Sequence, residues 1–199
     1  MRLIIVDGLD AVGKDTHGEL IKTYYEQKDE PVLLRSHPAT DNYFGRKAKQ
    51  ALLTKGKTNK IKASIYYMLD VLRSIRKYYH PNKPGTLIMV RYLLGTAYLP
   101  RRIVTYGYQF FEHFVPTSPY MFFLDASPEE LMKRVRKRSE IEIFETYDAL
   151  VKVRNKALLL TKHWYIIDTS PPIEETFSEI TKILKKLDKL TEKTSAHNS

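Results

Sequence analysis

The chain has 199 residues, a length that suits one domain with a substantial hydrophobic core. Hydrophobic residues make up 43% and charged residues 28%, which is a globular composition and not a disordered one. There is no cysteine, so disulfides and thiolate metal sites are excluded. The net charge of +10 favours anionic partners such as nucleotides, nucleic acid or an acidic membrane surface, and it also fits a solvated basic surface.

No apolar run in the sequence approaches the ~20 residues that a membrane-spanning helix needs. The first apolar run, Leu3–Val6, is followed at once by Asp7 and Gly8, so it is too short for a signal peptide. We therefore expect a cytoplasmic protein without a membrane partner.

Five short apolar runs predict the strands of one sheet. Each run is nearly continuous, as expected for strands buried on both faces of a parallel sheet, and helical patterns separate the runs. The sequence therefore predicts a three-layer α/β fold, with a five-stranded parallel sheet and helices on both faces. The predicted strands are Leu3–Val6, Val32–Leu34, Leu87–Val90, Met121–Leu124 and Tyr165–Ile167.

A phosphate-binding loop follows the first predicted strand. The segment from Gly8 to Lys14 reads G-x-x-x-x-G-K and opens the first helix, which is the context that this P-loop motif requires. The backbone amides can turn toward a phosphate, and the helix N-terminus favours negative charge. Lys14 can reach the β- and γ-phosphates of ATP. The predicted ATP-binding residues of the loop are Gly8, Asp10, Ala11, Val12, Gly13 and Lys14.

The residue after Lys14 departs from the motif. This position usually carries Ser or Thr, whose hydroxyl meets Mg²⁺, but here it is Asp15, with Thr16 next. The Asp15 carboxylate could hold Mg²⁺, repel the phosphates, or simply favour the helix dipole. Asp15 and Thr16 are therefore both candidate magnesium ligands and candidate ATP-binding residues.

Three helices carry clear signals further along the chain. Apolar spacing over residues 61–75 predicts a helix that ends near Pro81. The segment 127–130, Ser-Pro-Glu-Glu, is a capping box with proline at the first helical position. Ser170 opens the last helix, and the polar segment from about Thr191 is expected to fray.

Several segments occur in the order that they have in one known family. They are Asp10 in the loop, Arg35 after the second strand, Arg91-Tyr92 after the third, Ala97-Tyr98 beyond it, the stretch 136–145 (RKRSEIEIFE), and the closing 166–171 (IIDTSP). The loop is common to P-loop proteins in general, and the ordered set is the more specific signal. Over residues 1 to about 188 the chain resembles the thymidylate kinases.

This resemblance implies transfer of the γ-phosphate of ATP to thymidine monophosphate, with Mg²⁺. It also implies a single kinase domain over 1–190 with a lid at about 136–145, followed by a flexible tail at 191–199. A two-fold homodimer is implied as well. Such a transfer needs alignment and charge neutralisation, and it needs no nucleophile from the enzyme.

The resemblance assigns roles to individual positions of this chain. Lys14, Arg91 and Arg138 would be catalytic, and Arg136 would assist Arg138 on the ATP side. The residues that would bind the acceptor nucleotide are Asp10 at the sugar and phosphate, Arg35 and Arg91 at the phosphate, Tyr67 stacked on the base, and Tyr98 on the pocket wall.

The chain also departs from the family pattern at several positions. Val90 stands where the family has an aspartate before the Arg-Tyr pair, and the following segment is one residue shorter. Ser36-His37 stand where an acidic residue is usual, which with Val90 bears on Mg²⁺ handling. Val71 replaces a base-reading arginine, and Ile143 replaces the second lid arginine.

These departures leave other functions open. The chain could phosphorylate another nucleotide or a nucleoside, because Val71 removes a base reader. It could bind nucleotide without turnover, because Val90 and His37 stand in place of acidic residues. A nucleic-acid-stimulated ATPase is the least favoured alternative, because no aromatic–basic platform for single strands is found.

Overall fold

The computed structural model describes residues 1–54, 57–99, 102, 104–136 and 147–197. The side chains at positions 57, 60, 98 and 194–197 lie outside the description as well. Within the described part, no helix is long and apolar enough to cross a membrane.

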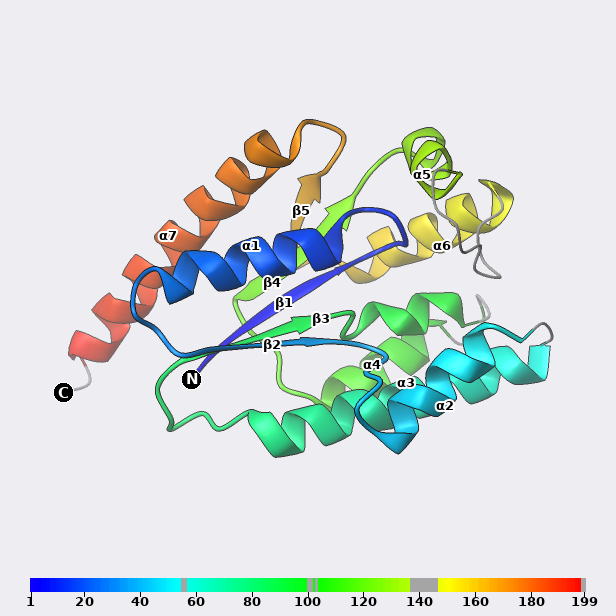
Figure 1. Ribbon diagram of the computed structural model, residues 1–199, viewed down its shortest axis with the longest axis horizontal. Helices are drawn as coiled ribbons and strands as arrows, with labels where there is room; N and C mark the ends of the chain where they lie inside the picture. Colours follow the sequence, from blue (N-terminus) through cyan, green and yellow to red (C-terminus); the bar gives the residue numbers. More distant parts are fainter. Residues whose placement is uncertain (55–56, 100–101, 103, 137–146, 198–199) are drawn as a thin grey trace.

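The sheet has five parallel strands in the order β2-β3-β1-β4-β5 (Figure 1). This arrangement confirms the predicted parallel sheet, and each predicted apolar run lies inside one strand. The strands are β1 (Arg2–Gly8), β2 (Val32–Ser36), β3 (Thr86–Val90), β4 (Tyr120–Asp125) and β5 (Tyr165–Asp168).

Helices cover both faces of the sheet, as the alternating pattern predicts (Figure 1). Helices α1 and α7 pack on one face, and α3 and α4 lie on the other (Figure 1). The helical elements are α1 (Lys14–Glu26), α2 (Tyr43–Leu52), α3 (Lys57–Tyr78), the 3₁₀ helix η1 (Leu94–Tyr98), α4 (Val104–Phe114), α5 (Pro128–Val135), α6 (Tyr147–Leu160) and α7 (Ile173–His197).

The three central strands form the core. All residues of β3 and β4 are buried, and so are the five inner residues of β1. A strand covered on both faces has no solvated side, so its sequence is apolar without alternation. The edge strands β2 and β5 contain partly exposed residues, which explains their shorter apolar runs.

The sequence predicts where the helices lie more accurately than it predicts which of their residues are buried. Ser127 caps α5 as predicted, with its Oγ accepting from the Glu130 amide at 3.2 Å. Ile61 and Ile65, which contribute to the periodicity of α3, are 52% and 48% exposed. The face of α3 toward the core is formed by Met68, Leu72 and Ile75 of the same apolar set, which pack against the core, together with the buried Val71.

The last helix continues past the point where the sequence predicts fraying. Helix α7 runs from Ile173 to His197, so residues 191–197 are helical. Thr191 has a tertiary partner, because its Oγ1 lies 3.1 Å from the Tyr120 hydroxyl oxygen. These two residues are 71 positions apart, so local composition cannot reveal their contact. From the sequence alone, a polar segment without periodicity is therefore interpreted as a flexible tail.

Candidate active site

The site begins where β1 ends. Gly8 closes the strand, and a side chain there would clash, since an added Cβ would lie 2.4 Å from the Leu124 carbonyl oxygen on β4. The chain then turns through Ala11, with φ of 68°, into Gly13, which caps α1. The G-x-x-x-x-G-K segment therefore has the strand–loop–helix setting that a phosphate loop requires.

Lys14 folds back over this loop. Its Nζ donates to the Leu9 carbonyl at 2.7 Å and to the Asp10 Oδ1 at 3.2 Å. Burial lowers the pKa of Lys14, and the charge of Arg91 lowers it further, against the opposing effect of nearby carboxylates. The ammonium is thus a cation held inside the loop.

Arg91 follows β3 at the same edge of the sheet. Its backbone has φ of 57°, a strained conformation for a non-glycine residue. Its guanidinium donates to the Asp15 Oδ1 at 2.9 Å and to the Ser36 Oγ at 3.1 Å, and it lies 3.9 Å from Asp10. Arg91 therefore joins the end of β2, the end of β3 and the start of α1.

Asp7 fixes the segment that presents Arg91. Its carboxylate accepts from the Gly8 amide at 2.9 Å, and from the amides of Tyr92 and Leu94 at 2.8 and 2.9 Å. Burial raises the pKa of Asp7, although these three amides act against that rise. The role of Asp7 is not predicted from the sequence, where it reads only as the last polar residue before the loop.

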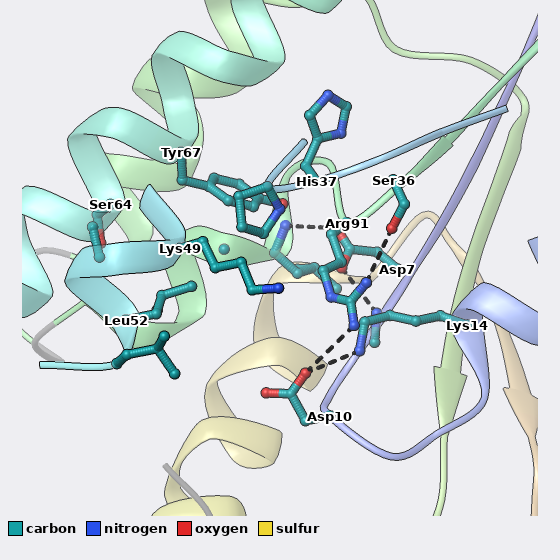
Figure 2. Close-up of a pocket in the computed structure, with 16 residues that line it drawn as sticks. Asp7, Asp10, Lys14, Ser36, His37, Lys49, Leu52, Ser64, Tyr67 and Arg91 are labelled. Atoms are coloured by element: carbon teal, nitrogen blue, oxygen red, sulfur yellow. Dashed lines mark hydrogen bonds and ion pairs between the residues drawn. The ribbon is translucent and has the colours of Figure 1, made fainter. Parts of the chain in front are cut away.

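A pocket of about 240 Å³ opens between the loop and the pair α2–α3 (Figure 2). Cationic and acidic side chains occupy the loop end of this pocket, and aromatic and aliphatic side chains occupy the other end. Its predicted members are Gly8, Asp10, Lys14, Tyr67 and Arg91, and its further members include Asp7, Ser36, His37, Lys49, Leu52, Ser64 and Gly95.

Tyr67 forms one wall of the pocket. Its ring lies against the backbone of Gly95, where an added Cβ would come within 2.5 Å of the ring. The Tyr67 hydroxyl donates to the Tyr92 carbonyl at 3.4 Å, and the ring lies edge-on to His37 with centroids 6.4 Å apart. A flat aromatic wall of this kind can stack with a nucleotide base.

His37 is buried beside this wall, although an isolated histidine after a strand is more often an exposed loop residue. One ring nitrogen, Nε2, lies 2.9 Å from the Ser74 hydroxyl, and Nδ1 lies 3.4 Å from the Val90 carbonyl. Burial lowers the pKa of His37 to about 4, so the ring is neutral at physiological pH.

Lys49 and Ser36 are pocket residues that sequence reasoning misses. Lys49 points from α2 into the pocket (Figure 2), and it adds a third cation to Lys14 and Arg91. On the sequence it is one of many lysines on a helix, which is the ordinary pattern of a solvated face. The only available signal is its place on the helix after β2, near the carboxyl edge of the sheet.

Arg35 is not brought into the pocket. Its guanidinium makes two hydrogen bonds to Asp41, at 2.9 and 3.0 Å, and lies over the ring of Tyr78. Successive strand residues point to opposite faces, so Ser36 rather than Arg35 meets Arg91 at the end of β2. The predicted contact between Arg35 and the acceptor phosphate has no support in this arrangement.

The remaining predicted residues lie at the margins. Thr16 is exposed on α1, and Arg136 is exposed at the C-terminal end of α5. Tyr98 ends η1, and its side chain is outside the described part. Arg138 and most of the predicted lid, residues 137–145, lie outside the described residues.

The acidic residues near the loop include one candidate magnesium ligand, Asp15. The described residues contain no group of three His, Asp or Glu side chains that could hold a metal alone. Asp15 presents a carboxylate beside Lys14, and Mg²⁺ in kinases is typically held by one or two carboxylates together with substrate phosphates. The donor set therefore fits Mg²⁺ bound jointly with a nucleotide.

Comparison with known proteins identifies relatives along nearly the whole chain. The family model described as thymidylate kinase matches residues 6–180. A probable thymidylate kinase from Archaeoglobus fulgidus is 27% identical, over 92% of this chain and 94% of the relative. A thymidylate kinase from Akkermansia muciniphila is 23% identical, over 92% of this chain and 91% of the relative.

Solved structures show the same fold. A thymidylate kinase from Candida albicans superposes with a TM-score of 0.76 at 18% identity, covering 94% of this chain and 92% of that one. A thymidylate kinase from Ehrlichia chaffeensis gives a TM-score of 0.67 at 16% identity, covering 92% and 98%. Because the family model spans well over half of its residues, this chain belongs to the thymidylate kinase family.

Proposed function

We propose that this protein transfers the γ-phosphate of ATP to a nucleoside monophosphate, with dTMP as the acceptor and dTDP as the product. The observation that carries the proposal is the shared pocket, which places Lys14 and Arg91 between the phosphate loop and the aromatic wall at Tyr67. Family membership and the names of the relatives support the same reaction.

The reaction requires these residues to align the two substrates and to neutralise the charge of their phosphates. The loop and Lys14 would hold the ATP phosphates, and Arg91 would hold the acceptor phosphate facing them. The transition state spreads charge over the oxygens of the transferring group, so fixed cations stabilise it directly. The acceptor phosphate is already anionic, and the enzyme therefore needs no general base.

Mg²⁺ is part of this proposal. Asp15, with the Thr16 hydroxyl as a second candidate, would hold the ion beside the ATP phosphates. When bound, Mg²⁺ would neutralise part of the charge of the transferring phosphate.

Recognition of the base would depend on residues other than Val71. Val71 is fully buried in the core, so it cannot contact a ligand. Ser64 and Lys49 are the polar side chains on the helical side of the pocket, and Tyr67 would stack on the base. These three side chains do not distinguish thymine from other bases as clearly as the cations identify a phosphate site.

The reaction is tested by a coupled assay of ATP consumption with dTMP as the acceptor. We expect turnover in the wild type, and a loss of about 100-fold or more in kcat for Lys14→Met, which keeps the length of the side chain but not its charge. Lys22→Ala, on the same helix but outside the pocket, is the matched control and should retain activity.

Other patterns of turnover would contradict the proposal. Activity stimulated by DNA but not by monophosphates would favour a nucleic-acid-dependent ATPase, and binding without turnover on any acceptor would favour a degenerate P-loop protein. A screen of common monophosphates and nucleosides in the same assay identifies the acceptor.

We further propose that the protein is a homodimer, as the family resemblance implies. Helix α4 supports the proposal, because its Tyr106, Phe110 and Phe114 are 74%, 58% and 55% exposed. These residues follow one another at intervals of four and so form one apolar stripe on the helix surface.

A further inference from the structure

The Asp15 carboxylate accepts hydrogen bonds from two side chains, Ser36 and Arg91, that could equally bind the phosphate of an acceptor. One of its oxygens, Oδ1, accepts from the Ser36 hydroxyl at 2.7 Å and from the Arg91 guanidinium at 2.9 Å. Ser36 and Arg91 are themselves 3.1 Å apart, so the two donors converge on one point. A hydroxyl and a guanidinium converging on an anionic oxygen are equally suited to a phosphate oxygen.

The two cations at the loop end of the pocket are paired with nearby carboxylates. Lys14 pairs with Asp10 at 3.2 Å, and Arg91 pairs with Asp15 at 2.9 Å while lying 3.9 Å from Asp10. An incoming phosphate therefore meets the Asp15 carboxylate on the same two donors, and the two anions repel each other.

We propose that Asp15 is a specificity-determining residue that stands in for the acceptor phosphate on Ser36 and Arg91. The inference rests on the proposed function, because it takes Arg91 as the partner of the acceptor phosphate. When a monophosphate binds, its oxygen replaces the Asp15 Oδ1 on both donors. The Asp15 side chain is 55% exposed, so the displaced carboxylate can turn into water.

This exchange selectively weakens the binding of phosphorylated acceptors. A ligand that must first displace a bound group has its apparent affinity reduced by the fraction of molecules in which the site is open. A nucleoside has no phosphate and does not need the two donors, so it does not meet this competition. Asp15 therefore narrows the difference in affinity between a monophosphate and its nucleoside.

The test is calorimetric titration of dTMP and of thymidine into the wild type and Asp15→Asn, with EDTA present and ATP absent. Asparagine keeps the shape of the side chain and can still accept from Ser36, but it has no charge. We expect dTMP to bind about tenfold more tightly to Asp15→Asn, which corresponds to about 1.4 kcal/mol, and thymidine to bind equally to both proteins.

Glu19→Gln is the matched control, since it removes one negative charge from an exposed position on the same helix and should change neither affinity. Equal or weaker binding of dTMP to Asp15→Asn would overturn this inference alone, and so would an equal gain for thymidine. If dTMP binds to neither the wild type nor the variants, the proposed function fails, and this inference fails with it. EDTA excludes a role of Asp15 in holding Mg²⁺ as the cause of a difference.

Discussion

Tyr67 shows how much of a pocket wall depends on one neighbouring residue. The sequence predicts that Tyr67 meets the base, and the structure places its ring in the pocket. The ring takes this position because Gly95 has no side chain, so the backbone of η1 can lie directly against it. Nothing near residue 67 in the sequence indicates that residue 95 must be glycine.

We expect Gly95→Ala to impair acceptor binding selectively. The added methyl would lie 2.5 Å from the Tyr67 ring, and relieving that overlap must move the ring or η1, at a cost of about 1–3 kcal/mol. Steady-state kinetics should show the KM for the acceptor raised about tenfold or more, with the KM for ATP little changed.

The control for this prediction is Gly107→Ala on α4, where the added methyl would meet only the flexible end of Leu99. It makes the same chemical change outside the pocket. An unchanged acceptor KM in Gly95→Ala would mean that Tyr67 does not define the acceptor site.

At the scale of elements, α2 and α4 each present side chains whose position the spacing of apolar residues does not predict. Helix α2 turns Lys49 into the pocket, and α4 presents aromatic side chains to its outer surface. Phe110 and Phe114 pack on each other with centroids 4.8 Å apart, which orders part of the outward face of α4. An ordered aromatic stripe is the kind of surface that a second copy can bury.

We expect Phe110→Ser to shift the protein from dimer to monomer. The change removes the central aromatic of the stripe and breaks its contact with Phe114. Size-exclusion chromatography with light scattering, over a range of protein concentrations, measures the mass. Leu159→Ser, at a residue 63% exposed on α6, should leave the mass unchanged. A wild type that is monomeric at all concentrations would refute the proposed dimer.

For the molecule as a whole, the functional pocket and a stabilising charged network lie at opposite ends of the strands. The carboxyl ends of β1, β2 and β3 hold the pocket, and the opposite ends hold a charged network around Asp188 on α7. The Asp188 carboxylate accepts from the hydroxyls of Tyr25 and Tyr120, at 3.1 and 3.0 Å, and lies 3.2 Å from the Arg2 Nε. This network ties the last helix to α1, β1 and β4.

We expect Asp188→Asn to lower the free energy of unfolding by about 2–4 kcal/mol, because it removes one partner of a largely buried charge cluster. The kcat should not change, since the pocket lies at the other end of β1. Urea unfolding measures the first quantity, and the coupled assay measures the second. Glu192→Gln, exposed on the same helix, serves as the control. An unaltered unfolding midpoint would show that the network contributes little.

The sequence by itself determined the five parallel strands and the phosphate loop. Continuous apolar runs arise wherever a strand is covered on both faces, and the loop is a local pattern of glycines and lysine, so both can be found without knowing what lies beside them. The ordered arginines and tyrosines also indicated the family. The strands and the loop are local patterns, and the family signal is the order of short local motifs along the chain, so none of these features requires knowledge of tertiary contacts.

Only the tertiary structure decided which charged groups meet. It paired Arg35 with Asp41, turned Lys49 into the pocket, and joined Asp15 to Ser36 and Arg91, which lie 21 and 76 positions away along the chain. The physical reason is that partners for a charge are selected by the register of strands and the packing of helices. Both of these bring distant segments together, and neither leaves a trace in local composition.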